Sequence, residues 1–253
     1  MSFELLFEPV EGLDTWLTGL FEGAPLLVAL GLAFALGLRH ASDPDHLVAV
    51  TSLVAADDGD TRGAVRLGAW WGVGHAGMLL AIGLPLIAFK SELPAWLEAA
   101  AEKAVGVVII VLAARVSWKW ARGDYRVGRH RHGKGSDVAP GARHRHLRHG
   151  KRAEHRHLGV RTPGQALGIG LLHGLAGTGA VVVLLIAALP TQLEAGAALA
   201  VFAPMSIVSM AGLTGAFAWV LTRSVIEPIY RAVLIPALGM FGLLFGLWYT
   251  GIT

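Results

Sequence analysis

The sequence predicts an all-α integral membrane protein with about six transmembrane helices. Of its 253 residues, 54% are hydrophobic and only 15% are charged, and the mean hydropathy is +0.58, far from the composition of a soluble domain. Several apolar runs reach the roughly 20 residues that a helix needs to cross a bilayer. Glycine is abundant, at 33 residues, and small residues allow the close helix packing of membrane bundles.

Six apolar segments meet the length requirement for a span, and they fall into two groups of three. The expected spans are 24–42, 65–89, 98–118, 164–189, 193–221 and 228–250. Residues 44–56 are compatible with a continuation of the first span as a broken helix, because Pro44 removes a backbone donor and clashes with the preceding turn. The expected organisation is therefore a first transmembrane repeat at 1–120, a loop at 121–161 and a second transmembrane repeat at 162–253.

The central segment, 121–161, is rich in Arg, Lys, His and Gly and has few large apolar residues, so it is expected to form a flexible loop. Basic residues concentrate on the cytoplasmic side of membrane proteins. The same side also receives Arg62, Arg66, Arg223 and Arg231 in the six-span model, which predicts a cytoplasmic loop and both termini outside. Residues 1–22 contain no Lys or Arg, which is wrong for a signal peptide, so this segment is expected to be retained.

The two halves share a short echo. Gly37-Leu-Arg-His40 ends the first apolar run, and Gly170-Leu-Leu-His173 lies inside the fourth. Three spans in each half would make two repeats inverted in the membrane, an arrangement that many transporters use with the binding site where the repeats meet. Chance is the alternative explanation for an echo of four residues.

The segment His40-Ala-Ser-Asp-Pro-Asp-His46 is the sharpest chemical feature of the chain. It places two imidazoles and two carboxylates within seven residues directly after an apolar run. Ionisable groups at membrane depth are costly and usually mark ion or substrate pathways. On a continuous helix His40, Asp43 and His46 would spread over an arc of about 120°, so all three could face one cavity. Alternatively, Asp43 caps a new helix that starts at Pro44, and Asp45 stabilises its positive end.

Two further histidines, His75 and His173, lie inside predicted spans among small residues. One such histidine alone would usually be a hydrogen-bonded core residue, but four among the spans predict a shared metal site. In chain order, the predicted ligands are His40, Asp43, Asp45, His46, His75 and His173. Without any cysteine, this set suits zinc, copper, nickel or cobalt. Protons compete with metals for imidazole, so transport through the site is expected to depend on pH.

The loop contains His-Arg-His three times, at 130–132, 144–146 and 155–157. Such tracts can bind metal, and the alternative is a solvated basic loop that sets topology and contacts anionic lipid. The loop has little aromatic content, which argues against nucleic-acid binding. The chain has no zinc-protease, phosphate-loop or nucleophile-elbow motif, so no enzyme activity and no required cofactor are expected.

Arg39-His40-Ala-Ser-Asp-Pro-Asp45-His46 resembles the signature of the nickel/cobalt transporter family, a His followed four residues later by Asp-His at the end of an early span. Gly74-His75 resembles the second Gly-His element of that family. The segment around His173 looks like the Leu-x-His-Gly stretch of related nickel exporters and urease-associated permeases.

The resemblance implies a secondary permease for Ni²⁺ or Co²⁺ in the cytoplasmic membrane, with the ion as its transported substrate. Uptake is expected because the His/Asp-His motif is complete, as in importers. Efflux is the alternative, because the His-rich cytoplasmic loop resembles that of exporters. A membrane-embedded metal sensor or metalloenzyme is the alternative from another class. The resemblance also implies metallochaperones or nickel-enzyme maturation proteins as partners, while the oligomeric state stays open.

Overall fold

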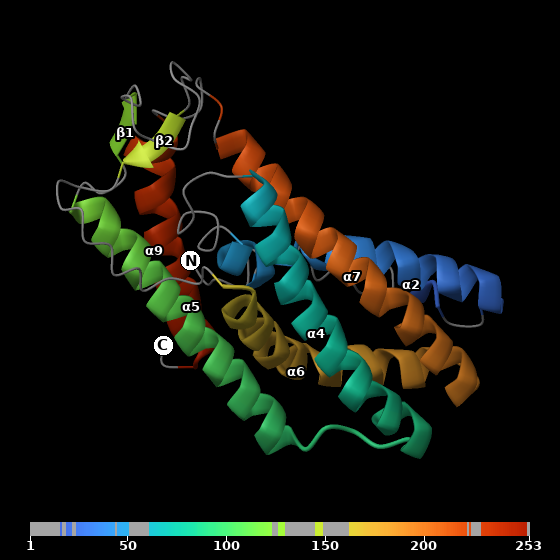
Figure 1. Ribbon diagram of the computed structural model, residues 1–253. Coiled ribbons are helices and arrows are strands. Elements are labelled where there is room, and N and C mark those ends of the chain that lie inside the picture. Colours follow the sequence, from blue (N-terminus) through green and yellow to red (C-terminus); the bar gives the residue numbers. More distant parts are fainter. Residues whose placement is uncertain are drawn as a thin grey trace.

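The computed structural model describes residues 24–43, 45–50, 61–122, 126–129, 145–148, 162–221, 223 and 229–251, together with residues 16 and 19–21. Helices dominate these ranges (Figure 1). In chain order the helices are α2 (Leu26–His40), α4 (Thr61–Phe89), α5 (Ala95–Ala121), α6 (Pro163–Ala188), α7 (Gln192–Leu221), the π-helical turn η1 (Tyr230–Leu234) and α9 (Ile235–Tyr249).

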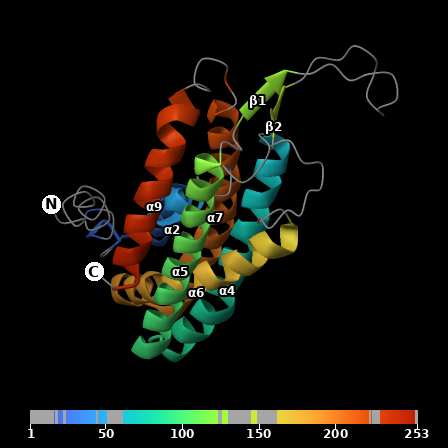
Figure 2. The same cartoon turned by 90° about the vertical axis from the view of Figure 1, so that its left-hand side faces the viewer.

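The segment expected to be a loop contains one small sheet. Strands β1 (Arg126–Arg129) and β2 (Arg145–Arg148) pair antiparallel, with Arg126 opposite Arg148. The two strands lie in the connection between α5 and α6, at one end of the bundle, and add no layer to it (Figure 2). The rest of the predicted loop, including most of the His-Arg-His repeats, lies outside the described residues.

Local sequence explains the start of α6 and is compatible with the prolines inside α4 and α7. Helix α6 begins with a capping box, in which Thr162 accepts a hydrogen bond from the backbone N–H of Gln165 and the Gln165 side chain accepts one from the backbone N–H of Thr162. Pro163 occupies the first turn, where a missing N–H costs nothing. Pro85 and Pro204 lie inside α4 and α7, as membrane helices tolerate when neighbouring helices support them.

Four described segments are long and apolar enough to cross a membrane: Thr61–Phe89, Pro163–Ala188, Gln192–Val220 and Ala232–Tyr249. Large apolar side chains also face outward along the helices. Leu27 is 83% exposed, Met240 63% and Val111 60%. Apolar side chains so exposed suit lipid and not water. The chain is therefore a multi-pass membrane protein. The other two predicted spans correspond to α2, a shorter apolar helix of 15 residues, and to α5, of 27 residues.

Helix α4 lies at the centre of the arrangement and packs against both α6 and α7. Helix α2 packs on α7, and α5 packs on α9 and, less extensively, on α6. Figure 1 shows α4 antiparallel to α7 and α5 antiparallel to α9. The cores between these pairs contain large apolar side chains and buried polar ones, the latter including His46, His75 and His173. The packing thus surrounds the predicted ligands with helices from both halves of the chain.

Candidate metal site

The chain interrupts its helical conformation between His40 and His46, as expected from the sequence. Helix α2 ends at His40, residues 41–43 form a turn, and helical conformation resumes at Asp45. Pro44, to which the interruption was attributed, lies outside the described residues. The backbone N–H of Leu47 donates to the carbonyl of Asp43 at 2.9 Å, which begins the new helical segment. The break turns the ionisable side chains into the bundle.

Ser209 of α7 holds this break in place from a neighbouring helix. Its hydroxyl donates a short hydrogen bond to the carbonyl of Leu38 and accepts one from the backbone N–H of Ala41 at 3.3 Å. Leu38 belongs to the last turn of α2, where carbonyls lack intrahelical partners. A single hydroxyl thus holds the backbone on both sides of Arg39 and His40.

Asp43 contacts its own segment and orients His40. One carboxylate oxygen lies 3.0 Å from Nδ1 of His40, and the other lies 3.1 Å from Nη2 of Arg39. A carboxylate that accepts a hydrogen bond from Nδ1 leaves the lone pair of a neutral imidazole on Nε2. The contacts of Asp43 therefore match a residue that orients a ligand, while its cap and ligand roles were left open from the sequence.

Close helix packing brings His75 and His173 to the same place. A Cβ added at Gly170 of α6 would collide with the carbonyl oxygen of Trp71, and one added at Gly174 would collide with that of His75, both in α4. Gly74 of α4 is likewise pressed against the backbone of α6. Only glycine permits this backbone contact. As a result His75, which is 0% exposed, and His173, which is 3% exposed, lie on two helices in direct contact.

The four imidazoles form one cluster. Ring centroids are 4.5 Å apart for His40 and His46, 4.8 Å for His40 and His75, and 4.3 Å for His46 and His173. The Nε2 atoms of His40 and His75 lie 2.9 Å apart. The cluster combines side chains from α2, the segment that follows it, α4 and α6.

Asp45 joins two of these histidines. One of its carboxylate oxygens lies 3.1 Å from Nδ1 of His46, and the other lies 2.6 Å from Nε2 of His173. Among the described residues, Nε2 of His46 and Nδ1 of His75 have no hydrogen-bond partner although both are buried. Buried nitrogens without partners are costly. A cation that accepts a lone pair would satisfy one of them.

Two groups of side chains have ligand atoms that all lie within 4.8 Å of one another. The groups are His40, His46 and His75, and Asp45, His46 and His173. All six predicted residues thus lie in one region. Five of them belong to these groups, and Asp43, which contacts His40, belongs to neither group. Nitrogen and oxygen donors without sulfur suit borderline divalent cations such as nickel, cobalt, zinc and copper.

Trp71 was not predicted as part of the site. Its ring centroid lies 5.4 Å from that of His46 and 5.7 Å from that of His173, and the residue is 2% exposed. The sequence does contain a signal for it, because Trp71 precedes His75 by four residues and so shares its face of α4. The indole forms an apolar wall behind the two imidazoles.

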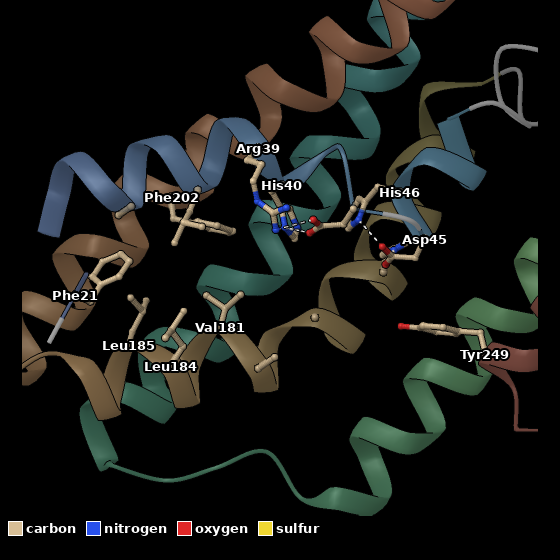
Figure 3. Close-up of a pocket in the computed structure, with 16 residues that line it drawn as sticks. Phe21, Arg39, His40, Asp45, His46, Val181, Leu184, Leu185, Phe202 and Tyr249 are labelled. Atoms are coloured by element: carbon tan, nitrogen blue, oxygen red, sulfur yellow. Dashed lines mark hydrogen bonds and ion pairs between the residues drawn. The ribbon is translucent and has the colours of Figure 1, made fainter. Parts of the chain in front are cut away.

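A cavity of about 370 Å³ opens beside the cluster. Figure 3 shows His40, Asp45 and His46 on one part of its wall, with Phe21 and Leu185 at the opposite end. His173 also lines this cavity, whereas His75 is not among the described residues that do. Apart from the ionisable residues and Tyr249, the described residues of the wall are mostly apolar.

Two known proteins are similar to this chain. The urease accessory protein UreH of Bacillus sp. (strain TB-90) is 26% identical over 226 residues, which cover 88% of this chain and 91% of that protein. A high-affinity nickel transport protein of Cupriavidus necator is 33% identical over 105 residues, which cover 40% of this chain and 29% of that protein. The second match thus spans less than a third of the relative's length.

No protein-family model matches the chain, and no solved structure matches it significantly. The two relatives nonetheless confirm the resemblance that the Asp45-His46 motif predicted, since one is a nickel transport protein and the other aligns along almost the whole chain. The chain is therefore similar to a urease accessory protein over most of its length and to a nickel transport protein over part of it.

Proposed function

We propose that the protein is a secondary permease that moves Ni²⁺ or Co²⁺ across the cytoplasmic membrane, in the direction of uptake. One observation carries the proposal: buried imidazoles and a carboxylate from three separate parts of the chain meet inside a bundle of apolar helices. Ionisable groups at such depth usually serve an ion pathway. The transported ion is a substrate, so no resident cofactor and no catalytic step are part of the proposal.

The ligand chemistry supports transport over permanent storage. The cluster offers imidazole nitrogens and one carboxylate, with no thiolate that would hold a borderline metal tightly. Conduction needs binding strong enough for entry and weak enough for release. The high-affinity nickel transport protein of C. necator supports nickel as the first candidate ion. Similarity to a urease accessory protein supports nickel-enzyme maturation proteins or a metallochaperone as partners.

The helix contacts support six spans in two inverted repeats. If α2, α4 and α5 are matched with α6, α7 and α9, the contact of α4 with α6 corresponds to that of α7 with α2. The contacts of α4 with α7 and of α5 with α9 each map onto themselves, and both pairs run antiparallel (Figure 1). Inverted repeats predict this exchange symmetry. The contact of α5 with α6 departs from it, because the matched pair of α9 and α2 packs at most weakly. The four-residue echo matches His40 with His173, although His40 ends α2 and His173 lies inside α6.

Charge supports the orientation. The start of α4 and the ends of α5 and α7 lie at the same end of the bundle as β1 and β2 (Figures 1 and 2). Arg62, Arg66, Arg122 and Arg223 belong to that end. The connection between α4 and α5, at the other end, carries Lys90 and Glu92. By the positive-inside rule the end with the strands, and the His-rich connection with it, faces the cytoplasm.

The test is Ni²⁺ and Co²⁺ flux in proteoliposomes that contain purified protein of known orientation. We expect flux in the native chain and its loss in His40→Ala and His46→Ala variants that remain folded. Glu92→Gln is the matched control, because this exposed acid lies outside the cluster and should leave flux unchanged. Liposomes in which β1 and β2 face the lumen have the proposed orientation of the cell. Accumulation of ions inside them would show uptake, and loss of ions from them would show efflux.

Three results would contradict the proposal. Stoichiometric metal that stays bound to the native chain without flux would favour a sensor or metalloenzyme. If the native chain neither binds nor transports either ion, the protein has no metal function. Retention of full flux in His46→Ala would show that ions cross elsewhere.

A further inference from the structure

The cluster contains two groups of three ligands, and they share one residue. The deep subsite comprises His40, His46 and His75, and the cavity subsite comprises Asp45, His46 and His173. All three ligands of the cavity subsite line the cavity, as do His40 and His46 of the deep subsite, whereas His75 is not among the described residues that line it. An ion in the cavity therefore reaches the complete cavity subsite directly, and it must move past the cavity wall to reach His75.

His46 cannot serve both subsites at once. A neutral imidazole has one N–H and one lone pair, so it binds a single cation unless it loses its second proton. The rings of His40 and His173 both lie next to the ring of the shared residue, with centroids 4.5 Å and 4.3 Å from it. Two divalent cations this close would also repel each other strongly inside an apolar bundle. Occupation of one subsite excludes the other.

The two subsites differ in charge. The cavity subsite includes the carboxylate of Asp45, whose oxygens lie 3.1 Å from His46 and 2.6 Å from His173. The deep subsite consists of three imidazoles, which are neutral when they bind metal. A carboxylate partly compensates a divalent charge, and three imidazoles do not. The cavity subsite is thus suited to capture from the cavity and the deep subsite to onward release.

On these observations, and resting on the proposed transport function, we propose that one divalent cation is handed between the cavity subsite and the deep subsite, with His46 as the shared ligand. The protein then binds one ion at a time in two alternative positions. Neither position alone completes the path, because His173 belongs only to the first and His75 only to the second.

The test is a Co²⁺ titration followed by visible absorption, combined with flux, on the full-length native protein and on His75→Gln and His173→Gln variants. Glutamine keeps a polar side chain in each buried position, and thermal unfolding of each variant shows whether it is folded. We expect one Co²⁺ per native chain. Each single variant should still bind one Co²⁺, with spectra that differ because only His75→Gln retains the carboxylate subsite, and each should lose at least 90% of flux. The double variant should bind none.

The possible failures are distinct. Two Co²⁺ bound together in the native chain, or complete loss of binding in either folded single variant, would overturn the two-subsite arrangement in favour of independent sites or one composite site. Full flux in either single variant would show that its subsite is not on the path. A native chain that binds no Co²⁺ and transports none would instead refute the proposed function.

Discussion

The Nε2 atoms of His40 and His75 lie 2.9 Å apart, so one imidazole donates a hydrogen bond to the other across 35 residues of sequence. Nδ1 of His40 lies 3.0 Å from Asp43, which is the natural acceptor for its proton. A neutral His40 therefore presents a lone pair at Nε2, and His75 is the donor. A cation that binds both nitrogens must displace that proton. The pair is already at ligand spacing before an ion arrives.

Metal binding should weaken as the pH falls. Each group of ligands contains at least two imidazoles, and a proton and a metal compete for the same lone pair. The affinity falls in acid because only the proton-free imidazole binds metal, and this form becomes scarcer as the pH falls. A decrease from about pH 7.5 to about pH 5.5 should lower the apparent Co²⁺ affinity by about tenfold or more. Spectroscopic titration at fixed ionic strength measures it, and an affinity independent of pH would exclude imidazole ligands.

Asp43→Asn should weaken binding without changing the number of ions bound. Asp43 accepts a hydrogen bond from His40 and pairs with Arg39. Without this carboxylate, the orientation and the tautomer of the His40 ring are no longer fixed. Loss of a group that orients a metal-binding histidine typically lowers affinity by about 10–100-fold. Asp45→Asn is the comparison, because it removes a ligand-distance carboxylate. If Asp43→Asn is the more damaging of the two in the same titration, Asp43 is itself a ligand.

Gly174→Ala should damage the site through the backbone. Its new methyl group would meet the carbonyl oxygen of His75 and separate α6 from α4. Overpacking of this kind costs about 1–3 kcal/mol. Gly168→Ala is the matched control on the same helix, since nothing lies within 4 Å of its added Cβ. The unfolding temperature in detergent and the metal flux should both fall for Gly174→Ala and not for Gly168→Ala. Equal values for the two variants would contradict the packing argument.

Ser209→Ala should loosen the helix break that positions His40. The variant removes the hydroxyl that bonds Leu38 and Ala41 from another helix, at a cost of about 1 kcal/mol. Ser206→Ala is the control, because the hydroxyl of Ser206 bonds Ala203 of its own helix. Metal affinity and unfolding temperature should decrease more for Ser209→Ala. An unchanged metal affinity would show that other contacts hold the break.

Hydropathy alone located the described helices well. The prediction of spans at 65–89 and 164–189 compares with α4 at Thr61–Phe89 and α6 at Pro163–Ala188. The break after His40 also followed from the sequence. The agreement between predicted and observed helices has a physical reason. Every backbone polar group in a membrane must find its hydrogen-bond partner within the helix, so the length of an apolar run decides where a helix lies. The paired strands in the central connection were missed, since neither has a strong apolar alternation.

The sequence by itself determined which residue types could bind a cation and that they lie at membrane depth, because charged and imidazole groups stand out in apolar spans. Only the tertiary structure decided their partners: His40 beside His75, Asp45 between His46 and His173, Asp43 turned to Arg39, and Trp71 against the cluster. The helices are apolar around their whole circumference, so their pattern does not say which face meets which neighbour. Glycine contacts between backbones set that rotation, and those contacts exist only once the helices are packed.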